Sequence, residues 1–211
     1  MDGETSSAQE TAATGGRRGS RSAHRPWVES LLDADARVLR RVHALSGGPA
    51  DGVMRAFTFL GNHQTWWAHT AAVAFFVGLL PAALLGGGSG AAAIVAQAIK
   101  RTVRRRRPDV GLVGFEASSE NPDVYSFPSG HTCGAVGGAV AVAFASPTVA
   151  MVFAGLAICI AFSRMYLGAH YPLDVLFGVL VGILSGWASA LVILALWPTL
   201  TEALSLPATI L

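Results

Sequence analysis

Charged side chains are scarce in this sequence. They make up 13% of the residues, whereas a soluble domain usually carries about 25%. Lysine occurs once, as Lys100, and from Pro108 to Leu211 the only cation is Arg164. Hydrophobic residues make up 52% of the chain. This composition excludes an ordinary soluble domain and favours a membrane protein.

Cysteine is also scarce, and a strong net charge is missing. Cys133 and Cys159 both lie in apolar runs, so we expect two small buried hydrophobic residues instead of a disulfide or a metal pair. The formal net charge of +2 does not by itself indicate a nucleic-acid partner.

The chain divides into four predicted parts. Residues 1–26 are rich in Ser, Ala, Gly, Thr and Arg and lack an apolar run, which is typical of a disordered tail. Residues 27–64 carry apolar residues at helical spacing with arginines on the other face, and predict amphipathic helices at a membrane interface. Residues 65–198 form the predicted transmembrane core, and residues 199–211 form a C-terminal tail.

Five apolar stretches make up the predicted core. The first, from Trp66 to Leu85, has no charged residue and is long enough to cross a bilayer, which takes about 20 residues. The segment "GGGSG" then predicts a turn into a Gly/Ala-rich helix that runs from about residue 91 into "KRTVRRRRP". The remaining stretches are 131–145, 148–162 and 173–197. We therefore predict an all-α fold, a polytopic membrane bundle of about five transmembrane helices with N-terminal interfacial helices.

Two charged residues fall inside this apolar core. Between Val124 and Thr201 only Arg164 and Asp174 carry a formal charge, and each would cost about 2.5–3.5 kcal/mol at the centre of a membrane helix. A simple ion pair between two helices would explain them, and so would a functional site.

The predicted topology favours a functional site. If five helices cross in turn, the end of the second, the start of the third, the end of the fourth and the start of the fifth share one face. Those places hold Lys100–Arg107, Ser129–His131, Ser163–Arg164 and His170–Asp174. Four groups that are distant in sequence would then meet at one end of the bundle.

Phosphate chemistry needs the residue types gathered there. Lys100 and Arg107 are seven residues apart, two helical turns, so they point the same way if the helix persists, and an arginine fork matches phosphate oxygens. In "FPSGH", Ser129 fits a helix start whose backbone N–H groups bind anions, Gly130 lets a ligand approach, and His131 can give up a proton near neutrality.

A histidine and a carboxylate complete the predicted site. His170 and Asp174 are four residues apart, so the carboxylate could hold one ring nitrogen and leave the other free to attack phosphorus. Nucleophile, orienting acid, general acid and oxyanion clamp are then present without a metal. These residues predict phosphoryl transfer through a phosphohistidine.

Three segments, taken in order, resemble one known family. "KRTVRRRRP" fits K-x6-RP, "PSGH" fits a second motif, and "SRMYLGAHYPLD" fits SR-x5-H-x3-D. The sequence looks like a type 2 phosphatidic acid phosphatase, from a family that shares its core with vanadium-dependent haloperoxidases. The likeness covers about Trp27 to Trp197.

The resemblance implies a role for each motif residue and a class of substrate. It implies His170 as the nucleophile, Asp174 as its partner and His131 as the acid for the leaving group. The residues it implies for phosphate binding are Lys100, Arg107, Ser129, Gly130 and Arg164. We expect the neighbouring Arg101, Arg105 and Arg106 to be flanking charges that affect membrane insertion or lipid-surface affinity more than turnover. It implies no metal and no cofactor. The expected protein is an integral membrane lipid phosphatase for phosphatidic acid, phosphatidylglycerophosphate or a polyprenyl phosphate or diphosphate.

Two other functions stay open on the sequence. A haloperoxidase-like protein would hold vanadate in the same pocket, although such relatives are typically soluble and larger. A membrane transporter or scaffold would use the charges to line an ion path or to pin helices, but it leaves the three motifs unexplained. No nucleic-acid partner is expected, because "RRRR" adjoins an apolar helix. The expected partners are a lipid phosphate and the bilayer, with the oligomeric state open.

The cations predict an orientation in the cell membrane. With five crossings the whole segment before Trp66 lies on the side of the site, and that segment and Lys100–Arg107 hold fourteen of the fifteen cations. Short basic loops stay cytoplasmic. We therefore predict a multi-pass protein whose active site faces the cytoplasm.

Overall fold

The computed structural model describes residues 26–119 and 123–203, which fold into helices joined by loops. The predicted disordered tail, apart from Pro26, lies outside the described residues, as do residues 204–211. Within the described ranges there is no strand, which confirms the all-α class. The helices are α1 (Pro26–His43), α2 (Ala50–Leu60), α3 (His63–Phe76), α4 (Leu79–Val103), α5 (Pro108–Gly111), α6 (Gly130–Val142), α7 (Pro147–Tyr166) and α8 (Pro172–Ala203).

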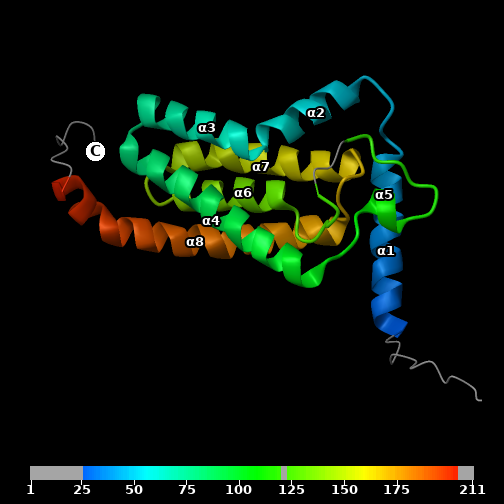
Figure 1. Cartoon of the computed structure of the whole chain (residues 1–211). Coiled ribbons are helices and arrows are strands. Elements are labelled where there is room, and N and C mark those ends of the chain that lie inside the picture. Colours follow the sequence, from blue (N-terminus) through cyan, green and yellow to red (C-terminus); the bar gives the residue numbers. More distant parts are fainter. Residues whose placement is uncertain (1–25, 120–122, 204–211) are drawn as a thin grey trace, which may run out of the picture.

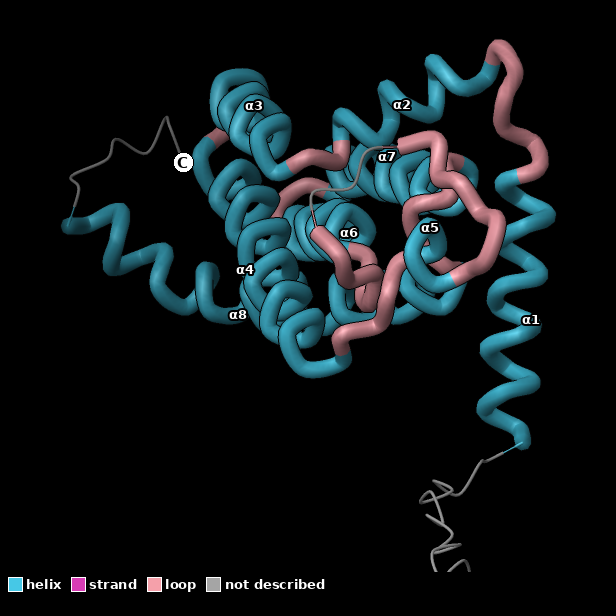
Figure 2. Tube along the Cα trace, turned by 45° about the vertical axis from the view of Figure 1, so that its right-hand side comes forward, coloured by secondary structure: helices cyan, strands magenta, loops and turns pink. Residues whose placement is uncertain are grey.

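Five of these helices form an elongated bundle around α6 (Figure 1, Figure 2). α6 packs against α4, α7 and α8, while α3 packs against α4. Nine of the 13 residues of α6 are buried. α6 is therefore enclosed mainly by protein, and the longer helices supply most of the outer surface.

Glycines allow α4, α6 and α8 to approach one another closely. A methyl group added at Gly88 of α4 or at Gly186 of α8 would collide with the backbone carbonyl of Gly137 in α6. Small residues at such contacts are typical of membrane helices, because the backbones then pack directly. This contact fixes three helices that carry four of the predicted site residues, Lys100, Gly130, His131 and Asp174.

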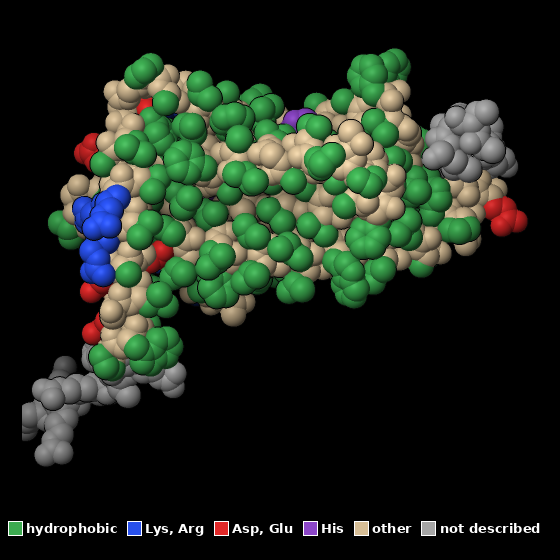
Figure 3. All heavy atoms as spheres, turned by 180° about the vertical axis from the view of Figure 1, so that it is seen from behind, with side chains coloured by type: hydrophobic (Ala, Val, Ile, Leu, Met, Phe, Trp, Pro, Cys, Tyr) green, Lys and Arg blue, Asp and Glu red, His purple; other side chains and the backbone are tan. Residues whose placement is uncertain are grey.

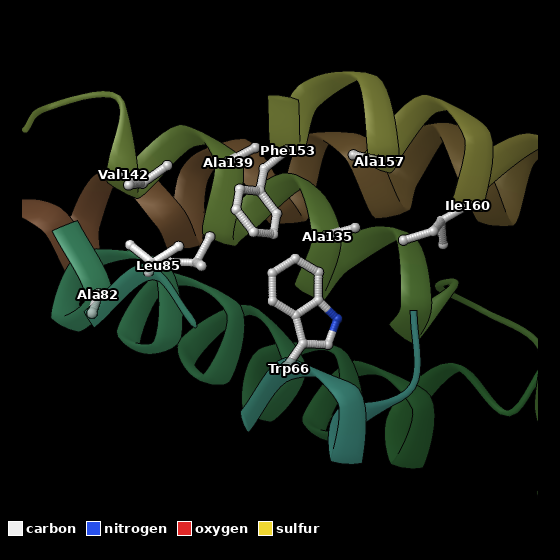
Figure 4. Close-up of a cluster of buried hydrophobic side chains, with 10 residues drawn as sticks. Trp66, Ala82, Leu85, Ala135, Ala139, Val142, Phe153, Ala157 and Ile160 are labelled. Carbon is white, nitrogen blue, oxygen red and sulfur yellow. The ribbon is translucent and has the colours of Figure 1, made fainter. Parts of the chain in front are cut away.

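A second contact region holds the larger apolar side chains (Figure 4). The ring of Trp66 in α3 lies 5.7 Å from that of Phe153 in α7, measured between centroids. The neighbouring buried residues from α4, α6 and α7 are Leu85, Ala135, Ala139, Val142, Ala157 and Ile160. Through this cluster α3 and α7 are attached to the central helix.

The outer surface of the bundle is apolar along its length (Figure 3). Phe75, Ile158 and Leu184 are each about two-thirds exposed or more, which is unusual in water. Among the described residues α4, α7 and α8 are long and apolar enough to cross a membrane. α3 has 14 residues and α6 has 13, fewer than the about 20 of an ideal span. Length and composition thus support three of the five predicted spans.

The predicted first span, from Trp66 to Leu85, is wrong as a single helix. The chain turns at Val77 and Gly78, between α3 and α4, and Gly78 has a φ of 137° that glycine adopts without steric cost. The predicted turn at "GGGSG" lies inside α4 instead. Its glycines persist as helix because Gly88 packs on α6, so tertiary contact overrides the local preference.

The predicted end of the last span is also wrong. We expected the helix to stop before Pro198, but α8 continues to Ala203 with that proline inside it. A proline removes one backbone hydrogen bond, and membrane helices tolerate this because neighbouring groups satisfy the freed carbonyl.

The two N-terminal helices lie at one end of the bundle. α1 crosses that end (Figure 1) and contacts α7 and α8, while α2 packs on α7. Leu39 of α1 is fully buried beside Phe115 and Tyr171. Asp35, one turn earlier on the same face, is also buried. The interfacial position of these helices stays a prediction.

Candidate functional site

The predicted site residues gather at the end of the bundle that α1 crosses (Figure 1). α4 and α7 end there, while α6 and α8 begin there, as the expected topology requires. A cavity of about 550 Å³ opens between these helix ends and the start of α3. Five of the predicted residues line it, namely Lys100, Arg107, Gly130, His131 and His170. The other three, Ser129, Arg164 and Asp174, are buried.

The turn after α7 places His170. Gly168 has a φ of 75°, in the left-handed region, and the N–H groups of Gly168 and Ala169 donate to the carbonyls of Met165 and Arg164. This is the Schellman pattern of a helix end. The N–H of His170 also donates to the Arg164 carbonyl, so the nucleophile candidate is fixed directly to the end of α7.

The hydrogen bonds around His170 assign its tautomer. Arg107 Nη1 lies 3.3 Å from His170 Nε2, and because a guanidinium only donates, Nε2 must accept. The hydrogen is then on Nδ1, which lies 3.6 Å from Asp174 Oδ2. Burial first, and then the charges of Arg164 and Arg107, hold the pKa of His170 well below its ordinary value. The imidazole is therefore neutral, with its lone pair on the side of Arg107.

Lys100 and Arg107 reach the site by a different route from the one expected. The helix does not persist to Arg107, because α4 ends at Val103 and Arg104 adopts a left-handed φ of 52°. Arg107 precedes α5 in extended backbone, and its Nη1 donates to the Ala169 carbonyl over 3.0 Å. The two cations converge through this turn and not through helical periodicity.

Asp123 occupies the space between these two cations, and sequence reasoning missed it. Its Oδ2 accepts from Lys100 Nζ at 2.8 Å, and its Oδ1 accepts from Arg107 Nε and Nη2. Burial raises the pKa of Asp123, but the hydrogen bonds from Lys100 and Arg107 lower it overall, so the group is an anion. A lone acid six residues before "SGH" was the available signal. The two cations thus already bind a planar oxyanion in this structure.

Replacing Asp123 with asparagine is expected to lower KM and the inhibition constant of inorganic phosphate about three- to tenfold. The carboxylate and a phosphate compete for Lys100 and Arg107, and a neutral amide competes less because charge-assisted hydrogen bonds are stronger by about twofold. Steady-state kinetics with phosphate as inhibitor measure both constants. Unchanged constants would show that Asp123 does not share its place with the phosphate group.

The start of α6 presents backbone and imidazole groups together. Gly130 and His131 line the cavity, while Ser129 is fully buried. The Ser129 hydroxyl lies 3.0 Å from that of Thr132, and the Ser129 N–H donates to the Asp174 carbonyl. His131 Nε2 lies 2.8 Å from Asn62 Oδ1. The amide oxygen accepts, so the proton of His131 lies on Nε2. Asn62, at the start of α3, is a second residue that sequence reasoning missed.

Arg164 lies at the end of α7 and is 2% exposed. Its Nη1 donates to Thr58 Oγ1 at 3.4 Å, and Thr58 in turn bonds Ser163 Oγ at 2.8 Å. α2 therefore supports the end of α7. The charge of Arg164 acts on His170 at close range.

Arg105 has a different environment from the one predicted. We expected a flanking surface charge, but its side chain joins two buried carboxylates, Asp35 Oδ2 at 2.6 Å and Asp174 Oδ1 at 2.8 Å. The expectation failed because the chain turns after Val103, which directs Arg105 inward. Removing one partner of such a buried pair costs about 3–5 kcal/mol.

Comparisons with known proteins agree with this geometry. Residues 81–198, more than half of the chain, match the model of the PAP2 superfamily. A lipid A 1-phosphatase of Rhizobium etli is 38% identical over 104 residues, which are 46% of this chain and only 43% of that protein. A decaprenylphosphoryl-5-phosphoribose phosphatase of Mycolicibacterium smegmatis is 36% identical over 143 residues, 64% of this chain and 75% of that protein.

A solved structure shares the arrangement of helices. The crystal structure of a transmembrane PAP2-type phosphatidylglycerolphosphate phosphatase from Bacillus subtilis superposes with a TM-score of 0.65 at 22% sequence identity. The match covers 76% of this chain and 84% of that chain. At this identity the likeness establishes the fold.

Proposed function

Because this chain belongs to the PAP2 superfamily, we propose that it is a multi-pass membrane phosphatase that hydrolyses a lipid phosphate through a phosphohistidine. The observation that carries the proposal is the position of His170 Nε2. It lies 3.3 Å from the Arg107 guanidinium, which together with Lys100 already binds the carboxylate of Asp123. A nucleophile and an oxyanion clamp therefore meet at one cavity.

Binding begins with an exchange of anions. A phosphate group takes the place of the Asp123 carboxylate between Lys100 and Arg107, and the arginine fork turns from His170 Nε2 to phosphate oxygens. Phosphate carries more negative charge and more acceptor oxygens than a carboxylate, so the exchange favours the substrate. Gly130 contributes the backbone at the start of α6, and Arg164 adds positive charge behind the cavity.

The first chemical step transfers the phosphoryl group to His170. The lone pair of Nε2 attacks phosphorus, and the bond from phosphorus to the lipid oxygen breaks. The departing oxygen keeps the bonding pair and receives a proton from the His131 imidazolium, which forms when the negative charge of the bound phosphate raises the proton affinity of the ring; Asn62 holds that ring in place in the resting site. The attack makes the His170 ring cationic, and the Asp174 carboxylate beside Nδ1–H stabilises that charge.

The second step returns the enzyme to its starting state. Water attacks phosphorus while His131, now a neutral imidazole, accepts a proton from it. The bond from phosphorus to Nε2 breaks, and its electron pair returns to the ring. The N–H of Ser129 donates to the backbone carbonyl of Asp174. This bond keeps Asp174 and His170 in the same relative position during both steps.

Phosphate release by the detergent-purified protein tests this proposal. We expect turnover without added metal and in EDTA, because Lys100, Arg107 and Arg164 supply the positive charge for the phosphate oxygens. Orthovanadate should inhibit competitively, as a five-coordinate mimic of the transition state that binds about a hundredfold or more tightly than substrate. Loss of turnover in EDTA, or non-competitive inhibition, would contradict the site as described.

The substrate class is narrowed by a panel of lipids. The panel holds phosphatidic acid, phosphatidylglycerophosphate, and polyprenyl phosphate and diphosphate. It also holds lipid A and decaprenylphosphoryl-5-phosphoribose, because two relatives are named for these substrates. The preferred lipid is the one with the highest kcat/KM.

The proposed orientation places the catalytic end in the cytoplasm. The visible Lys and Arg side chains gather at that end (Figure 3), as they do in cytoplasmic loops. A reporter fused after Leu211 reads the opposite side, and a cytoplasmic signal from it would reverse the orientation.

A further inference from the structure

We propose that Arg105 and Asp35 are positioning residues, which hold Asp174 and through it His170 in the attacking geometry. This inference rests on the proposed function, because it assumes that His170 is the nucleophile. Asp35 lies outside the three motifs, Arg105 fills a variable position of the first one, and neither residue lines the cavity. Their effect on the reaction must therefore pass through Asp174.

The two oxygens of Asp174 have separate partners. Oδ1 accepts from Arg105 Nη1 at 2.8 Å, whereas Oδ2 accepts from the Tyr171 N–H at 2.9 Å. Oδ2 is also the oxygen that faces His170 Nδ1. With Oδ1 held by Arg105, the carboxylate cannot rotate without breaking a charge-assisted bond. Arg105 and the Tyr171 N–H together therefore determine which oxygen is presented to the nucleophile.

Asp35 holds the other end of the same guanidinium. Its Oδ2 accepts from Arg105 Nη2 at 2.6 Å, and its Oδ1 accepts from the Leu173 N–H at 2.9 Å. Leu173 is the second residue of α8, directly before Asp174. Asp35 thus fixes both the cation and the helix start that carries the acid, and it does so from α1.

Burial shields the contacts between Arg105 and its two carboxylate partners from water. The side chains of Asp174 and Asp35 are 0% and 1% exposed, and that of Arg105 is 18% exposed. The guanidinium carbon lies 3.9 Å from the centroid of the Tyr171 ring, which covers one of its faces. Because solvent is largely excluded, water is a poor substitute for either carboxylate.

Substitutions that break the link should reduce kcat and leave binding intact. We expect Arg105→Gln to lower kcat about 10- to 100-fold, the usual effect of losing a residue that orients a ligand or catalytic group. KM and the inhibition constant of inorganic phosphate should stay within about twofold, because Lys100 and Arg107 are unchanged. Arg105→Lys keeps the charge but cannot span both carboxylates, so its kcat should fall between those of Gln and wild type.

A neighbouring arginine supplies the matched control. Arg106 is exposed, and Arg106→Gln removes the same charge one residue away, so its kinetics should equal those of wild type. Asp35→Asn keeps an oxygen for the Leu173 N–H while removing the charge, and should lower kcat about three- to tenfold. If Asp35 acts through Arg105, the double variant should be no slower than Arg105→Gln alone.

The experiment compares kcat, KM and phosphate inhibition for these variants, normalised to folded protein by size-exclusion chromatography in detergent. Should Arg105→Gln fail to fold, Asp35→Asn and Arg105→Lys carry the test. Folded variants with wild-type kcat, or strictly additive losses in the double variant, would overturn the inference. His170→Ala is assayed in parallel: if it retains turnover the proposed function fails, whereas an inactive His170→Ala beside fully active Arg105 variants overturns this inference alone.

Discussion

Replacing His170 with alanine is expected to lower turnover at least about a thousandfold, because the variant loses the atom that we propose attacks phosphorus. The rest of the site should persist. Arg107 keeps its bond to the Ala169 carbonyl, and Asp174 keeps its bonds to Arg105 and to the Tyr171 N–H. Phosphate release per folded molecule measures the loss, and rapid quenching with labelled substrate should detect phosphoprotein in wild type and none in the variant.

A histidine outside the cavity provides the control for this variant. His69 of α3 packs between Trp66 and Phe153 and touches none of the proposed catalytic groups. We expect His69→Ala to keep turnover within a fewfold of wild type after normalisation to folded protein. A His170→Ala protein with more than a few per cent of wild-type turnover would rule out the nucleophile assignment.

Replacing Arg107 with lysine is expected to lower kcat/KM about 100- to 1000-fold, the range for loss of a group that stabilises a developing oxyanion. All three nitrogens of the Arg107 guanidinium make contacts. Nε and Nη2 donate to Asp123, while Nη1 donates to the Ala169 carbonyl and lies beside His170 Nε2. A lysine ammonium keeps the charge but cannot bind phosphate as a fork while also holding the turn that carries His170.

Arg104→Lys is the matched control for this substitution. Arg104 is exposed, and its Nε donates to the Arg101 carbonyl, so a lysine there should have little effect on turnover. Comparable losses in the two variants would mean that the effect comes from the basic segment as a whole and not from the Arg107 fork.

The sequence predicted the site better than it predicted the path of the chain. Local patterns place Gly130 and His131 at a helix start and Arg164 at a helix end, and a bundle of crossing helices brings such ends together. The errors arose where tertiary contacts decide local structure. Packing on α6 keeps "GGGSG" helical, and a single left-handed residue at position 104 ends the helix before it reaches Arg107.

The charged residues that support the site, Asp35, Arg105 and Asp123, were harder to predict, and the physical reason differs from one residue to the next. Asp35 lies four residues from both Leu31 and Leu39, so a carboxylate on the apolar face of α1 was visible in the sequence and indicated a buried partner. The identity of that partner was not visible, because Arg105 turns inward only after the break at Arg104. Asp123 comes from a loop without periodicity, and only the three-dimensional path brings it to Lys100.

The location of the cavity at the end of the bundle has a kinetic consequence. Trp66 and Ala96 line it together with the catalytic groups, so a lipid would arrive by lateral diffusion within one leaflet while its phosphate leaves into water. The relevant substrate concentration is then a mole fraction in a two-dimensional phase, and Michaelis constants expressed per volume of solution would vary with the amount of membrane. Rates of such an enzyme can be compared between samples only when the surface density of the substrate lipid is the same.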